Sequence, residues 1–145
     1  MDTFGDLGLS YMIVCTASVY GASLVCLAAI GVYAAKHAEN KKASAMLIVL
    51  MAMPTTHVIY AMLFVSTLAK VTDPNLFVGK MILALCIGIA MGSAAIGQGK
   101  IGIRACAALK ESDKDATNYI LAMGLIETAS LLAMIVGKNL IPIAK

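Results

Sequence analysis

Charged side chains are scarce in this chain. Only 13% of its 145 residues are Asp, Glu, Lys or Arg, whereas 61% are hydrophobic. The mean hydropathy is +0.90. A soluble domain of this size needs far more polar surface. The composition therefore excludes a soluble globular protein and leaves no room for a second, soluble domain.

Several functional motifs are also missing. The four cysteines form no CxxC pair, and we interpret them as small buried side chains and not as a redox or metal centre. There is no P-loop for binding a nucleotide triphosphate. The formal charge of +3 does not indicate a nucleic-acid partner, because the basic residues sit at the edges of apolar runs. The first ten residues contain no basic residue, unlike a cleaved signal peptide, so we expect the first apolar helix to stay.

Four long apolar runs make up most of the sequence. Residues 7–35, 43–69 and 81–99 carry no Asp, Glu, Lys or Arg, and Glu127 is the only charged residue between Asp115 and Lys138. An apolar run of about 20 residues spans a bilayer as a helix. The sequence predicts an all-α integral membrane protein with helices at Leu9–Ala35, Ala43–Ala69, Leu76–Leu109 and Ala116–Ile141. The last third of the third helix is basic and should project beyond the membrane. Pro74 is expected to stop a helix.

The basic residues indicate an orientation. Seven belong to the loop after the first helix and to the junction of the third and fourth helices, and four belong to the other side. The positive-inside rule then places those connections in the cytoplasm and both termini outside, which we expect in a bacterial plasma membrane. The two groups are Lys36, Lys41, Lys42, Lys100, Arg104, Lys110 and Lys114 against Lys70, Lys80, Lys138 and Lys145.

The chain also repeats itself. The sequence Ala-Ala-Ile-Gly occurs at 28–31 and again at 94–97. This indicates two tandem helical hairpins in one orientation, residues 1–72 and 73–145. Aligning the hairpins sets Thr55 against Glu127 and Val32 against Gln98. One hairpin has thus kept an ionisable site that the other has lost.

Glu127 is the residue on which the functional interpretation depends. It lies near the middle of the fourth helix, where a carboxylate costs about 2.5–3.5 kcal/mol on insertion scales. Such residues mark ion or proton paths, although a protonated Glu that merely bonds a neighbouring helix is the plainer alternative. The second helix carries Pro54, Thr55, Thr56 and His57 at a similar depth. Oxygen ligands at this depth would suit a hard cation.

Polar and small residues continue the pattern on the third helix. Gln98 is one such residue, although a lone membrane Gln often serves only to join helices. Gly88 and Gly92 form a GxxxG that further glycines extend, and the first helix has Ala17 and Gly21 at the same spacing. Small faces let helices approach closely, which suits an inner circle of helices but also ordinary bundle packing.

Three motifs together resemble a known family. They are Met-Pro-Thr-Thr-His-Val-Ile-Tyr at 53–60, Ala-Ala-Ile-Gly-Gln-Gly-Lys at 94–100 and Leu-Ile-Glu-Thr at 125–128. In this order they resemble the rotor-ring proteolipid of V-type ATPases (the K or c subunit) in its duplicated four-helix form. The resemblance covers essentially the whole chain and implies a ring of identical copies.

The resemblance also implies an ion site. In sodium-pumping relatives, the matching residues make Glu127 the ion-binding carboxylate, helped by Gln98, Thr56 and the backbone carbonyl of Met53. These four residues form the possible Na⁺ ligand set. Tyr60 would donate a hydrogen bond to Glu127.

His57 departs from the family pattern. Where those relatives have Gln, this chain offers an imidazole nitrogen, which is a poor ligand for sodium. Glu127, Gln98, Thr56 and Met53 could still supply enough oxygens for Na⁺, whereas a proton site needs only Glu127 and one partner. The count slightly favours sodium, H⁺ stays open, and no other cofactor is expected.

The resemblance implies a rotary mechanism. Each Glu127 would take an ion from a half-channel in a stator membrane subunit and then face membrane lipid once neutralised, while the cytoplasmic loops dock on central-stalk subunits. The chain would be a non-catalytic membrane subunit of an ATP-driven pump. Two alternatives are a small glutathione-transferase-like membrane enzyme and a secondary transporter with a single carboxylate. A large detergent-stable ring would exclude both.

Overall fold

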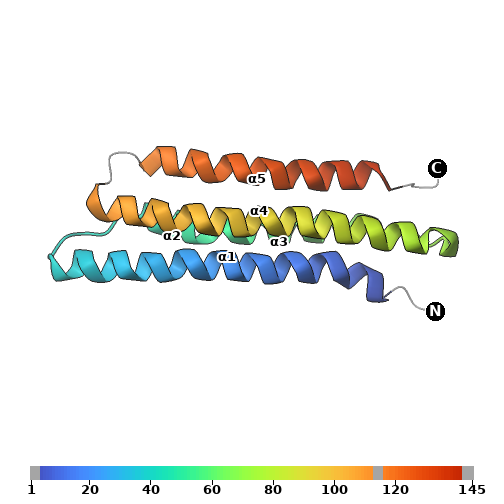
Figure 1. Cartoon of the computed structure of the whole chain (residues 1–145), viewed down its shortest axis with the longest axis horizontal. Coiled ribbons are helices and arrows are strands. Elements are labelled where there is room, and N and C mark those ends of the chain that lie inside the picture. The colour runs from blue at the N-terminus through green and yellow to red at the C-terminus, as the bar shows by residue number, and fades with distance from the viewer. Residues whose placement is uncertain (1–3, 113–115, 142–145) are drawn as a thin grey trace.

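The computed structural model describes residues 4–112 and 116–141, with side chains from residue 8 onward, and every secondary-structure element in this part is a helix. It forms four rods. The first is α1 (Phe4–Ala38), the third is α4 (Phe77–Glu111) and the fourth is α5 (Ala116–Asn139). The second rod consists of three consecutive elements: α2 (Met46–Ala52), the 3-10 turn η1 (Met53–Thr55) and α3 (Thr56–Leu68). The rods run side by side, with the described chain ends at one end of the bundle and the C-terminal ends of α1 and α4 at the other (Figure 1). The four predicted helices are confirmed, with boundaries shifted by a few residues.

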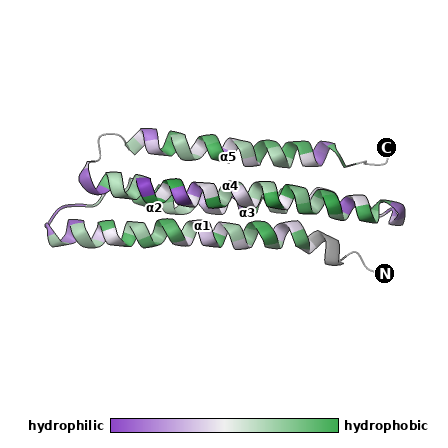
Figure 2. Ribbon diagram, viewed as in Figure 1, coloured by the Kyte–Doolittle hydropathy of each residue, from purple (hydrophilic) through white to green (hydrophobic). Residues whose placement is uncertain are grey.

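Each of the four rods is long and apolar enough to cross a membrane. Figure 2 shows hydrophobic colour along all four rods and hydrophilic colour mainly at their ends and in the loops. At 1.5 Å per residue, the 35 residues of α4 rise about 52 Å, more than the ~30 Å hydrocarbon core. Part of α4 therefore extends beyond the membrane core. Lys114, Asp115 and Lys145 lie outside the described residues.

The two prolines of the helical region have different effects. At Pro54 the second rod tightens into η1, since proline cannot donate the backbone hydrogen bond of an α-helix, yet the rod continues into α3. Pro74 was expected to stop a helix, and this was wrong. The second rod already ends at Leu68, and Pro74 begins the 3-10 turn η2 (Pro74–Leu76) that leads into α4. Proline suits this first position, and the Asp73 carboxylate accepts a hydrogen bond from the Asn75 backbone N–H at 2.9 Å.

Glycines set the spacing between α1 and α4. A Cβ atom added to Gly99 would lie 2.6 Å from the Cα of Gly21, and one added to Gly88 would lie 2.9 Å from the Cα of Ser10. The helix backbones touch directly at these levels, as the small-residue pattern predicts. Gly97 departs from this series, because it faces Ile126 of α5 instead.

The core consists of two apolar clusters along the length of the bundle. One lies towards the described chain ends and includes Val14, Phe64 and Met91. The other lies towards the C-terminal ends of α1 and α4 and includes Val25, Leu47 and Met123. The residues between them on each rod include the buried polar side chains Ser18, His57, Gln98 and Ser130. This middle region, which we call the polar layer, contains the predicted ion site.

Candidate ion site

Glu127 is held by a residue of another helix. The hydroxyl of Tyr60 on α3 donates a hydrogen bond to Glu127 Oε1 on α5 at 2.8 Å. Glu127 is partly buried, at the edge of the polar layer. The bond joins the two rods that carry the aligned positions of the two hairpins. One carboxylate oxygen is therefore occupied, and the other can bind a proton or a cation.

Thr56 and Met53 lie together at the proline break. The Thr56 hydroxyl donates to the Met53 carbonyl at 2.8 Å, and the same carbonyl accepts the Thr56 backbone N–H. A hydroxyl that donates its proton to a carbonyl keeps its lone pairs for a further ligand. The Thr56 oxygen can thus still face a cation, whereas the Met53 oxygen already accepts two hydrogen bonds.

Gln98 is fully buried, and only the nitrogen of its side-chain amide is hydrogen-bonded. Its Nε2 donates to the backbone carbonyl of Met123 at 3.0 Å, which lies one turn before Glu127 on α5. Its Oε1 has no hydrogen-bond partner among the described residues. An amide oxygen buried without a partner costs free energy, so an unpaired acceptor in this place is typical of a ligand position.

His57 is also fully buried, and neither ring nitrogen has a hydrogen-bond partner in the described part of the chain. The carbonyl of Pro54 lies near the ring without completing a hydrogen bond. The ring meets the Tyr60 ring edge to face, with centroids 6.2 Å apart and an interplanar angle of 63°. The His57 ring therefore packs against Tyr60, the residue that donates a hydrogen bond to Glu127.

Thr55, the position aligned with Glu127, has a different environment. It is exposed on the surface of its rod, and its hydroxyl donates to the Ala52 carbonyl at 2.6 Å. Thr128 on α5 does the same with the Gly124 carbonyl at 2.9 Å. Both hydroxyls are satisfied within their own helices and need no ligand.

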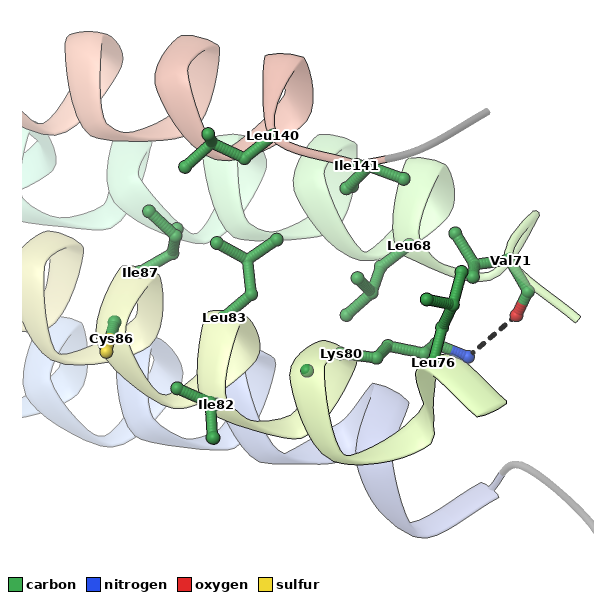
Figure 3. A pocket seen from close by; sticks show the side chains of 11 residues that line it. Leu68, Val71, Leu76, Lys80, Ile82, Leu83, Cys86, Ile87, Leu140 and Ile141 are labelled. Carbon is green, nitrogen blue, oxygen red and sulfur yellow. Dashed lines mark hydrogen bonds between the residues drawn. The ribbon is translucent and has the colours of Figure 1, made fainter. Parts of the chain in front are cut away.

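Several buried polar groups could not be selected from the sequence. Ser10, Ser18 and Ser130 are buried, and their hydroxyl oxygens have no hydrogen-bond partner among the described residues. Helical spacing alone could not separate them from other small packing residues. Lys80, which is expected at a membrane edge, is 6% exposed, and its ammonium donates to the Val71 carbonyl at 3.1 Å. It lines an apolar cavity of about 530 Å³ between the ends of α3, α4 and α5 (Figure 3).

Ligands other than clustered acidic, His and Cys side chains would have to hold any cation. No group of three or more such side chains that could hold a metal occurs in residues 4–112 and 116–141. Besides Glu127, the predicted ligand set of Gln98, Thr56 and Met53 offers amide, hydroxyl and backbone oxygens.

One comparison with known proteins matches part of the chain. The family model for the C subunit of ATP synthase matches residues 72–138, which contain η2, α4 and nearly all of α5. The match covers 67 of the 145 residues, and residues 72–138 are similar to this family. Its members are non-catalytic rotor proteolipids that form rings and pair with other membrane subunits of the ATPase, and catalysis lies in those other subunits. The chain is thus an integral membrane protein. No curated protein and no solved structure matches the chain.

Proposed function

We propose that the chain is the duplicated four-helix rotor proteolipid of a V-type rotary ATPase and that it carries one Na⁺ or H⁺ on Glu127. The observation that carries this proposal is the Tyr60–Glu127 hydrogen bond of 2.8 Å within a polar layer between two apolar clusters. A carboxylate at this depth is costly, and it is retained where it serves an ion path.

Two features support the duplicated form. The family match covers only one hairpin, and the preceding residues build a second pair of membrane-length rods. In addition, the two hairpins share Ala-Ala-Ile-Gly in the first rod of each pair, at 28–31 and 94–97. A ring of such copies would carry one carboxylate for every four helices.

The mechanism follows from the cost of charge in lipid. An empty Glu127 carboxylate cannot turn towards the hydrocarbon cheaply, whereas a loaded one is neutral. Each copy would therefore load from a half-channel of a stator subunit, rotate through the lipid and unload at a second half-channel. One elementary charge moved across 100 mV costs about 2.3 kcal/mol, so several ions must cross for each ATP. The connections at the cytoplasmic end would dock on the central stalk.

The geometry is compatible with either ion. The unpartnered Gln98 oxygen and the Thr56 hydroxyl favour a cation with oxygen ligands, in line with the slight preference for sodium drawn from the sequence. Two features favour a proton, which needs only Glu127 and one partner. The His57 nitrogens are poor sodium ligands, and the Met53 carbonyl oxygen already accepts two hydrogen bonds. The preference for sodium stays a prediction.

A labelling experiment tests the site and the ion together. We would treat the purified protein with a carbodiimide, which attacks protonated carboxyl groups, across pH and with or without NaCl. We expect Glu127 to be labelled and Glu127→Gln to show no labelling at this position. Exposed Glu111 is the internal control, since sodium should not protect it. Protection of Glu127 by sodium identifies a sodium carrier, and dependence on pH alone identifies a proton carrier.

The ring is tested separately. Native mass spectrometry of the purified protein should show one large closed oligomer that survives detergent. A stable monomer or dimer would contradict the rotor proposal and would favour the enzyme or the secondary transporter. Failure of Glu127 to react under any condition would contradict the ion site even if a ring forms.

A further inference from the structure

The packing of α1 against the second rod defines which residues face each other. The two run antiparallel, and a Cβ added to Gly21 would lie 3.3 Å from the Cβ of Pro54. Two turns nearer the described chain ends, Val14 of α1 and Ala61 of α3 belong to the same apolar cluster. Moving one residue towards the N-terminus of α1 therefore corresponds to moving one residue towards the C-terminus of the second rod.

This register places Ser18 opposite His57. Ser18 lies three residues before Gly21 and four after Val14, and His57 lies three after Pro54 and four before Ala61. Both side chains are buried, with relative exposures of 1% and 0%. The sequence provides no sign of this pairing, because it arises only from the register of two helices.

Both residues have unsatisfied polar atoms at this level. Ser18 Oγ and the two ring nitrogens of His57 have no hydrogen-bond partner in the described part of the chain. The register sets the two groups at the same level, and neither is hydrogen-bonded to the other. Buried polar groups in this situation are commonly joined by an ordered water that makes about three hydrogen bonds. The Pro54 carbonyl, one turn before His57 on the same rod, would be the third partner beside Ser18 and His57.

We propose that Ser18, His57 and the Pro54 carbonyl bind one structural water molecule between α1 and the second rod, directly behind the ion site. The water fixes the His57 ring, and the ring in turn packs edge to face on Tyr60, which holds Glu127. Ser18 is thus a positioning residue that acts on Glu127 from a helix that does not touch it through a hydrogen bond. The effect on Glu127 rests on the proposed function, whereas the water site does not.

Magnetic resonance can detect this water directly. The chain has two histidines, His37 and His57, so ¹⁵N-histidine labelling of His37→Gln protein in lipid bilayers reports on His57 alone. We expect magnetisation transfer from a long-lived water to the His57 ring N–H. Ser18→Ala should abolish this transfer and shift the His57 nitrogen signals.

Ser10→Ala is the matched control. Ser10 is also on α1, fully buried and without a hydrogen-bond partner for its hydroxyl among the described residues, but it lies against Gly88 and two turns from Ser18. This variant should leave the His57 spectrum unchanged. Absence of water transfer in the protein with native Ser18 would overturn the proposal, and this result does not depend on whether Ser18→Ala folds. An equal change in Ser10→Ala would also overturn it, because the effect would then be general to α1.

A second readout tests the link to the ion site. Carbodiimide labelling of Glu127 should become severalfold faster in Ser18→Ala than in Ser10→Ala, because a looser His57 releases Tyr60 from the carboxyl group. Equal rates would overturn the positioning role. If Glu127 is not labelled in any protein, the proposed ion site fails, and the His57 spectrum still decides on the water.

Discussion

Replacement of Gly99 by Ala tests whether direct backbone contact holds α1 and α4 together. The new Cβ would lie 2.6 Å from Gly21 Cα and 2.7 Å from Gly21 O, and both atoms belong to the backbone. Ordinary van der Waals contact begins at 3.4 Å, so the helices must separate by most of an ångström. Overpacking of a tight core costs about 1–3 kcal/mol, and we expect this loss in the free energy of unfolding.

Gly79→Ala is the matched control on the same helix. Nothing lies within 4 Å of a Cβ added at Gly79, so only the helix propensity changes, and alanine is favoured by up to about 1 kcal/mol. The two substitutions are chemically identical and should have opposite signs. Reversible unfolding in mixed detergent micelles, followed by circular dichroism, measures both. A Gly99→Ala protein as stable as Gly79→Ala would refute the packing argument.

Three further predictions concern single polar contacts. Tyr60→Phe removes a hydrogen bond to the Glu127 carboxyl group, worth about 1.5–3 kcal/mol, so carbodiimide labelling should become about tenfold faster or more; unchanged labelling would contradict the contact. Gln98→Leu loses a 3.0 Å bond to an α5 carbonyl but also removes a buried oxygen without a partner, so the free energy of unfolding should change by less than about 1 kcal/mol. Lys41 lowers the pKa of the Glu39 carboxyl through a 2.9 Å ion pair, and NMR titration of Lys41→Met should show the pKa of Glu39 rising towards its usual value. The stabilisation from this pair is present above the ordinary pKa of Glu and is lost as the pH falls through the lowered value.

The helices could be predicted because a bilayer leaves few alternatives. Apolar runs of the required length must be helical to satisfy their backbone groups, so the four rods followed from charge-free segments alone. The break at Pro54 was equally predictable from its missing N–H. The direction of the Pro74 effect was not, because proline both ends helices and begins them, and the choice depends on where the preceding helix ends.

Contacts between helices were harder to predict than helices. Glu127, Gln98 and His57 could be selected because each interrupts an apolar run, but their partners lie on other rods. Spacing along one helix cannot reveal the register between two, so the position of Ser18 opposite His57 was missed. The burial of Lys80 was missed for a similar reason, because the carbonyl that accepts a hydrogen bond from its ammonium belongs to Val71, just after the end of α3.

In the proposed ring, the two aligned positions would explain why only one hairpin needs a loaded ion to face lipid. The Thr55 hydroxyl already donates to a carbonyl of its own helix, so Thr55 can be exposed to hydrocarbon at any time. The Glu127 carboxylate is not satisfied within its own helix. Its hydrogen-bond donor at 2.8 Å belongs to α3 and satisfies only one of the two oxygens. The second oxygen must receive a proton or a cation before this part of α5 meets lipid. In the proposed ring, rotation is therefore coupled to loading at one position per chain, and the first hairpin passes through the lipid without an ion.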